Sequence, residues 1–248
     1  MARRPTRKSA AKPAGRAARA SAPRAAAAAG GERERIIAAF LALLAEKPIE
    51  RIGLAEIARE AGVSLTQLRG EFASPLAILA AHIKAIDRAV LAEDFSDMAE
   101  EPPRERLFDV LMRRLEALAP YREAIRSLLR SARRDPPLAL ALNGLAVRSQ
   151  QWMLTAADIN ASGPGGMVRA QGLAVLFSSV LRTWLRDEDP GLARTMAALD
   201  RALGRGQRLV GFLDDLCHIP MRLCRLRSRW GRRGSRDDRD EAEESAAA

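Results

Sequence analysis

Apolar side chains recur at intervals of three and four residues along most of this chain, which is the spacing that places them on one face of an α-helix. The first run predicts a helix from about Glu34 to Glu46. Its apolar residues are Ile36, Ile37, Phe40, Leu41, Leu43 and Leu44. Lys47-Pro48 ends this helix, because proline cannot continue it. No stretch alternates with period two for long enough to suggest a strand, so the pattern predicts an all-α protein.

The next segment, from Leu54 to Leu68, predicts two short helices joined by a tight turn. Gly62 can adopt a positive φ and reverse the chain, and Ser64 can cap the second helix. The apolar residues around the turn are Leu54, Ile57, Ala58, Ala61, Val63 and Leu68. Two helices held at a steep angle in this way fit the major groove of DNA. The alternative is an ordinary helical hairpin within an all-α core.

A further long helix is expected after this pair. Ser74 can cap it, and Pro75 fits its first turn, where a missing N–H costs nothing. The expected buried face carries Leu76, Ile78, Leu79, Ile83, Ile86, Val90 and Leu91. This helix would link the helix-turn-helix to the rest of the chain.

The order of these features over residues 33–90 resembles the TetR/AcrR family of bacterial transcriptional regulators. The residues that carry the resemblance are Ala58, Gly62, Val63 and Ser64 around the turn, and Phe72 at the close of the second helix. The resemblance implies a TetR-like fold with an N-terminal three-helix domain containing the helix-turn-helix, and a C-terminal helical bundle for ligand binding and dimerisation. It also implies a homodimeric, ligand-responsive repressor that binds double-stranded DNA.

Two positions depart from the family pattern. Arg69 stands where the family usually has a tyrosine, and Pro75 where a lysine opens the next helix, and both of those family residues touch phosphate. Arg69 can itself bind phosphate or a guanine edge. The expected DNA-contacting residues are Ser64, Leu65, Thr66, Gln67 and Arg69. Gln67 suits adenine, Thr66 a methyl group or phosphate, and Ser64 positioning on the backbone through the helix N-terminus.

Charge is concentrated at the two ends of the chain, whose formal net charge is +10. Residues 1–24 carry eight basic residues and no acid, and residues 222–236 carry seven arginines. Residues 237–244 carry six acids and one arginine, so the rest of the chain is neutral overall. Electrostatic attraction to nucleic acid must therefore come from the ends or from local patches.

The segment 1–31 is rich in Ala, Arg, Pro and Ser and shows no apolar periodicity, so we expect a disordered basic arm. Such an arm can follow the phosphate backbone or enter the minor groove beside the recognition helix. The alternatives are a solvated tail without a specific partner and an organellar transit peptide.

Helical spacing continues through the second half of the chain. Helices are expected over about 107–118, 121–131, 136–159, 168–186 and 192–203, with a flexible loop at Gly163-Pro164-Gly165-Gly166. The expected organisation is a disordered basic arm at 1–31, a DNA-binding domain at 32–92, a regulatory and dimerisation domain at 93–206, an amphipathic basic helix at 207–230 and a disordered charged tail at 231–248.

Large apolar side chains in this half give two candidate sites. Phe177, Leu181 and Trp184 lie on one stripe and are expected at a dimer interface, because a two-fold partner is needed to place two recognition helices one DNA turn apart. A pocket for an apolar or lipid-like effector is expected from Phe108, Met112, Tyr121, Trp152 and Met153. In both cases plain core packing is the alternative.

The end of the second half resembles a different group, the TetR-fold lipid-binding family of ubiquinone biosynthesis. The resemblance rests on the pair Trp184-Leu185, the acidic break at 187–189 and the run Leu199-Asp200-Arg201. It implies, as the alternative function, a peripherally membrane-associated accessory protein without DNA binding. The segment 207–230 fits this alternative, because its apolar side and basic end suit an anionic lipid surface. Docking of its apolar part on the body of the protein is equally compatible with the pattern.

Catalysis and metal binding have no support in the sequence. His82 and His218 are the two histidines, and there is no glycine-rich phosphate loop and no zinc-ligand spacing, so we expect no enzyme activity, metal or cofactor. Cys217 and Cys224 lie seven residues apart on one expected helix and are poorly placed to bridge each other. Without a long apolar run or a secretory signal, a cytoplasmic protein is expected.

Overall fold

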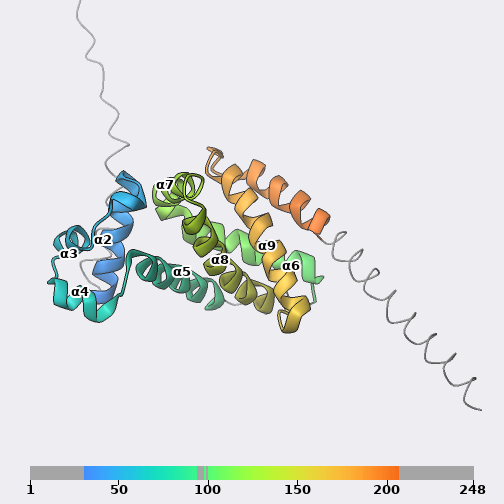
Figure 1. The fold of residues 1–248 in the computed structure, drawn as a ribbon. Helices are drawn as coiled ribbons and strands as arrows, with labels where there is room; N and C mark the ends of the chain where they lie inside the picture. Colours follow the sequence, from blue (N-terminus) through green and yellow to red (C-terminus); the bar gives the residue numbers. More distant parts are fainter. Residues whose placement is uncertain (1–30, 94–97, 99, 207–248) are drawn as a thin grey trace, which may run out of the picture.

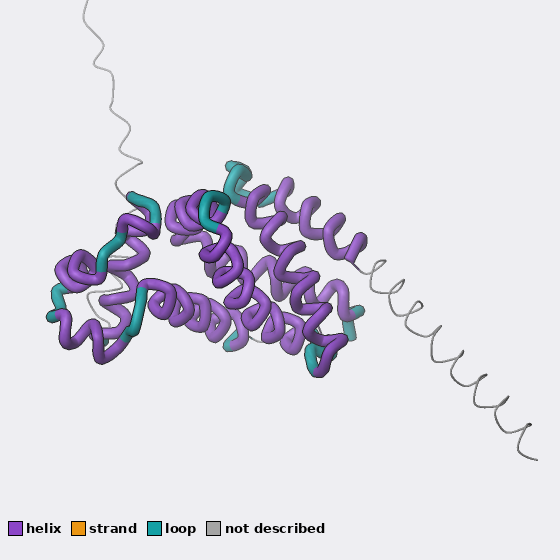
Figure 2. The backbone as a smooth tube through the Cα atoms, in the orientation of Figure 1, coloured by secondary structure: helices purple, strands orange, loops and turns teal. Residues whose placement is uncertain are grey.

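The structure, a computed structural model, describes residues 31–93, 98 and 100–206. These residues form helices joined by short loops, and no strand occurs among them (Figure 2). The all-α fold class predicted from the apolar spacing is therefore confirmed. The expected basic arm up to residue 30, the helix at 207–230 with Cys217 and Cys224, and the tail at 231–248 lie outside the described residues.

An N-terminal group of helices contains the helix-turn-helix (Figure 1). It consists of α2 (Glu32–Glu46), the 3-10 helix η1 (Ile49–Arg51), α3 (Leu54–Ala61) and α4 (Leu65–Glu71). Their apolar faces enclose a cluster that we call the N-terminal core. It includes Ile36, Phe40, Leu44, Ile57, Ala58, Leu68 and Phe72. The apolar stripe of α2 thus supports both helices of the helix-turn-helix, which fixes their angle.

The turn between α3 and α4 follows the predicted chemistry. Gly62 has a φ of +66°, a conformation in which a β-carbon would be strained. The N–H of Val63 donates to the carbonyl of Ala58 at 3.0 Å, which closes the last turn of α3. The chain therefore reverses within a few residues and enters α4.

The linking helix α5 (Pro75–Leu91) packs in both halves of the molecule. The Oγ of Ser74 accepts a hydrogen bond from the N–H of Ala77 at 3.2 Å, as expected of a cap. Ile78 lies in the N-terminal core, whereas Ile86 lies in a second cluster formed with the following helices. Because α5 contributes side chains to both clusters, it connects the N-terminal helices to the rest of the chain.

The second half is a helical bundle. Its elements are α6 (Pro103–Leu118), η3 (Ala119–Tyr121), α7 (Arg122–Ala132), α8 (Pro136–Ala156), α9 (Gly163–Trp184) and a helix at 193–206. The cluster that they enclose with the end of α5 is called here the C-terminal core. It includes Leu111, Leu115, Met153, Phe177, Trp184 and Leu199.

Helix α7 contacts both cores. Ala124 is buried in the N-terminal core, and Ile125 packs against the C-terminal core. Ser127 Oγ donates to the carbonyl of Lys47 at 3.1 Å, and Ser131 Oγ donates to the carboxylate of Glu50 at 2.8 Å. These hydrogen bonds attach α7 to the end of α2 and to η1.

The glycine-rich segment after α8 differs from the prediction of a flexible loop. Residues 163–166 form the first turn of α9, and the connection between the two helices is the preceding stretch 157–162. Pro164 is compatible with this turn, because a first-turn residue has no helical N–H bond to lose. Gly166 is needed for packing, since a β-carbon there would lie 2.1 Å from the carbonyl carbon of Ala161.

Candidate nucleic-acid interface

The second helix of the helix-turn-helix, α4, has one buried and one exposed side. Leu68 is buried in the N-terminal core, and Phe72 closes the helix against the same core. The five residues expected to contact DNA are all exposed: Ser64, Leu65, Thr66, Gln67 and Arg69. No described part of the chain covers this side, so a duplex has access to it.

A capping box rigidifies the start of α4. The N–H of Gln67 donates to Ser64 Oγ at 3.1 Å, and the N–H of Ser64 donates to Gln67 Oε1 at 2.8 Å. Both side chains thus satisfy backbone groups at the helix end. Gln67 Oε1 is already an acceptor here, so the free capacity of this side chain lies mainly in its amide N–H groups. Bidentate adenine binding, which uses both ends of the amide, would share the capping oxygen.

Leu65, Thr66 and Arg69 remain available beside this box. Leu65 is the first residue of α4 and is 57% exposed. An apolar side chain at this position can contact a thymine methyl group. Thr66 and Arg69 are three residues apart, so they lie on one face of the helix.

The charges around α4 are partly neutralised. Arg33 of α2 pairs with Glu71 at 2.9 Å, and its guanidinium lies 4.4 Å from the ring centroid of Phe72. This contact offsets the acid at the end of α4, and the sequence pattern gave no signal for it. Arg69 forms no ion pair with any described residue, so its charge is available to a phosphate or a guanine.

The residues expected to form an effector pocket are not all brought together. Met153 is fully buried, and Phe108, Met112 and Tyr121 are half-buried against the C-terminal core. Trp152, in contrast, is 57% exposed on α8. Neighbouring helix residues point about 100° apart, so Trp152 and Met153 do not line one cavity of the monomer. The prediction for Trp152 is corrected accordingly.

The predicted dimer stripe is also corrected. Phe177 and Trp184 are buried in the chain's own C-terminal core, and Leu181 is half-buried against it. Trp184 further stacks beneath the guanidinium of Arg122, 4.5 Å from the ring centroid. Phe177 and Trp184 therefore belong to the inner face of α9, and Leu181 lies at its edge.

A buried polar cluster joins α5, α6 and α8. The carboxylate of Asp87 accepts hydrogen bonds from the guanidinium of Arg114 and, at 2.7 Å, from Ser149 Oγ. Asp87 lies four residues after Ile83, on the apolar stripe of α5, and this out-of-place acid is the one sequence signal for the cluster. Through this one carboxylate, side chains of α5, α6 and α8 are linked inside the molecule.

One turn earlier on α5, His82 packs against Tyr121 with the two rings edge to face and their centroids 4.4 Å apart. Burial, together with the nearby charge of Arg114, lowers the pKa of His82 from 6.5 to about 4. The imidazole Nε2 has no hydrogen-bond partner among the described residues. His82 is therefore a neutral, buried residue near the junction of the two cores.

Neither a metal site nor a membrane span is found in the described part of the chain. No three His, Cys, Asp or Glu side chains within it are grouped so as to hold an ion. None of its helices combines the length and apolarity needed to cross a bilayer.

Comparison with known proteins places the fold. No protein-family model and no curated protein matches the sequence. Among solved structures, the chain is similar to a TetR transcriptional regulator from Nitrosomonas europaea, with a TM-score of 0.54 and 21% identity over 71% of this chain and 97% of that one. It is also similar to a TetR transcriptional regulator from Rhodococcus sp. RHA1, with a TM-score of 0.51 and 22% identity over 71% of this chain and 95% of that one. The chain thus has a TetR-like fold, as the order of its motifs predicted.

Proposed function

We propose that this protein is a DNA-binding transcriptional regulator that inserts α4 into the major groove of double-stranded DNA. The observation that carries the proposal is the exposed side of a capped helix, α4, on which no other described residue covers Leu65, Thr66 or Arg69. Thr66 and Leu65 would read the base edges, and Arg69 would bind a guanine or a phosphate. The capping box would hold the helix N-terminus toward the phosphate backbone.

A homodimer follows from the geometry of such binding, because two half-sites one helical turn apart need two recognition helices related by two-fold symmetry. The outer faces of α8 and α9 are the surface best suited to the second copy. Leu140 is 74% exposed and Trp152 57% on α8, while Val168 and Val175 are 58% and 59% exposed on α9. Apolar residues gathered on one surface are typical of a protein interface, and Val168 and Val175, seven residues apart, share one side of α9. Trp152 thus fits the dimer face better than the effector pocket.

The ligand response of the proposed repressor would pass through α7. This helix packs in the N-terminal core through Ala124 and is hydrogen-bonded to α2 and η1 through Ser127 and Ser131. An apolar effector held near Phe108 and Met112 would change how α7 meets α6 and α8. The consequence would be a shift between two dimer shapes with different spacing of the α4 helices.

Selection from a random duplex pool tests the proposal, since the full-length chain would enrich one sequence. Affinity for that duplex is then measured by fluorescence anisotropy at several salt concentrations. We expect Arg69→Ala to weaken binding by about 1–3 kcal/mol, or roughly 5- to 150-fold. Arg130→Ala, which removes an exposed arginine from α7, is the matched control and should bind like the wild type.

Absence of any enriched, salt-sensitive duplex would contradict the proposal. An isoprenoid lipid that copurifies with the protein, together with that negative result, would support the lipid-binding alternative.

A further inference from the structure

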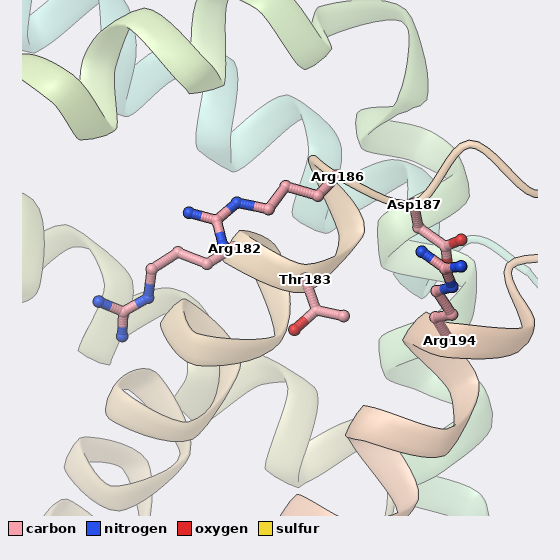
Figure 3. Close-up of a pocket in the computed structure, with 5 residues that line it drawn as sticks. All are labelled: Arg182, Thr183, Arg186, Asp187 and Arg194. Carbon is pink, nitrogen blue, oxygen red and sulfur yellow. The ribbon is translucent and has the colours of Figure 1, made fainter.

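The C-terminal end of α9 carries a small basic pocket on the opposite half of the molecule from α4. Its volume is about 210 Å³, and it is lined by Arg182, Thr183, Arg186, Asp187 and Arg194. In Figure 3, Arg182 and Arg186 extend on one side of Thr183, and Arg194 lies on the other side near Asp187. Pockets for drug-sized ligands measure roughly 300–1,000 Å³, so this one suits a small ligand or a single charged group.

The pocket has an excess of positive charge. Among the described residues, none of its three arginines lies within ion-pair or side-chain hydrogen-bond distance of a partner, although the charge of Arg194 helps to lower the pKa of Asp187. The carboxylate of Asp187 accepts from the hydroxyl of Thr195 at 2.7 Å and from its N–H at 2.8 Å. These hydrogen bonds, led by that from the hydroxyl, lower the pKa of Asp187, which keeps it ionised. Three guanidinium groups and one carboxylate leave a formal charge of +2.

The end of a helix ordinarily repels anions, because its unpaired carbonyls carry partial negative charge. Here two arginines of α7 bind the carbonyl of the last residue of α9 and two carbonyls just beyond it. Arg126 donates to the carbonyl of Leu185 at 2.6 Å, and Arg122 donates to that of Asp187 at 2.8 Å and also to that of Trp184. The pocket therefore lies beside a helix end whose negative charge is already offset.

We propose that this pocket binds the dianionic phosphate of a phosphate monoester, either a small soluble molecule or the head group of a lipid. A phosphate monoester carries a charge of about −1.5 to −2 at pH 7 and three strong acceptor oxygens. That charge matches the excess of the pocket. Arginine forks bind two phosphate oxygens at once, and the hydroxyl of Thr183 can donate to another.

The pocket adjoins the proposed dimer face. Arg182 lies seven residues after Val175, so it continues the same exposed side of α9. Arg194 belongs to the helix at 193–206 and is not part of the exposed side of α9. A variant of Arg194 therefore tests the pocket independently of dimer formation, and this separates failure of the inference from failure of the proposed function.

Calorimetric titration of the full chain with glycerol 3-phosphate at pH 7.5 and low salt is the direct test. We expect saturable binding that Arg182→Gln and Arg194→Gln each weaken about tenfold or more, because each removes charge-assisted hydrogen bonds. Arg130→Gln is the matched control and should bind like the wild type. Dimethyl phosphate, a monoanion with fewer free oxygens, should bind more weakly than glycerol 3-phosphate.

Vesicles distinguish the two sources of the phosphate. Flotation with vesicles that contain phosphatidic acid, a lipid monoester, is compared with flotation with phosphatidylglycerol vesicles. A preference for phosphatidic acid that Arg194→Gln removes would support the proposal with a lipid as the source. The proposal is overturned if glycerol 3-phosphate gives no heat and no such preference exists. It is equally overturned if Arg130→Gln weakens binding as much as the pocket variants do.

Discussion

The buried imidazole of His82 makes the stability of this protein depend on pH in a predictable direction. In the folded chain the pKa of His82 is lowered from 6.5 to about 4, mainly because burial disfavours the charged form. The unfolded chain therefore binds a proton between about pH 6.5 and pH 4, while the folded chain does not. The stabilisation is fully present above pH 6.5 and is lost as the pH falls toward 4.

The magnitude follows from the two pKa values. One pKa unit corresponds to about 1.4 kcal/mol, so the full depression amounts to about 3 kcal/mol below pH 4. Between pH 7 and pH 5 the contribution of His82 to the free energy of unfolding falls by about 2 kcal/mol. Since His82 packs on Tyr121 at the junction of the two cores, a charged imidazole there should weaken the whole fold.

Urea denaturation followed by circular dichroism at pH 7 and pH 5 measures this difference. The wild type should lose about 2 kcal/mol more between the two pH values than His82→Gln, which cannot titrate at that position. Comparing pH differences removes the constant packing effect of the substitution. Equal pH dependence of the two proteins, within about 0.5 kcal/mol, would refute the reasoning, because it would mean that His82 titrates in the folded chain as it does in the unfolded one.

Three further outcomes are expected. Asp87→Ala should lower the free energy of unfolding by about 3–5 kcal/mol in urea denaturation, because it leaves the guanidinium of Arg114 buried without its carboxylate; a loss below about 1 kcal/mol would contradict the structural role of the pair. Ser64→Ala should cost about 0.5–2 kcal/mol through loss of the capping box and weaken duplex binding, measured by denaturation and anisotropy together; an unchanged stability would argue against the cap. Val175→Glu should halve the molar mass seen by light scattering while the helical circular dichroism stays the same, whereas a wild type that is itself monomeric would exclude the proposed interface.

The sequence predicted the turn and the helix α4 well because local rules determine them. Gly62 ends α3 and Ser64 caps α4, and both effects involve only neighbouring residues. Leu68 is buried in the core, so the opposite side of α4 faces outward. The exposure of Thr66 and Arg69 then follows from helical geometry alone. Assignments of this kind need no knowledge of distant contacts.

Other features depended on contacts between distant segments, and there the pattern was ambiguous. The stripe with Phe177 and Trp184 looks the same whether it faces the chain's own core or a second subunit, and the structure places it in the core. The exposure of Trp152 and the pairing of Asp87 with Arg114 likewise depend on how α5, α6 and α8 meet. Periodicity defines the apolar side of a helix but not its partner.

The double attachment of α7 has a thermodynamic consequence. Its serines are hydrogen-bonded to the end of α2 and to η1, and its arginines to the carbonyls beyond α9. A tilt of α7 would therefore move both of these attachment points. Linkage is reciprocal: if a small molecule at the far end alters the affinity for an operator, the operator must alter the affinity for that molecule by the same factor. Titration with a candidate small molecule, with and without duplex, would therefore measure this factor directly.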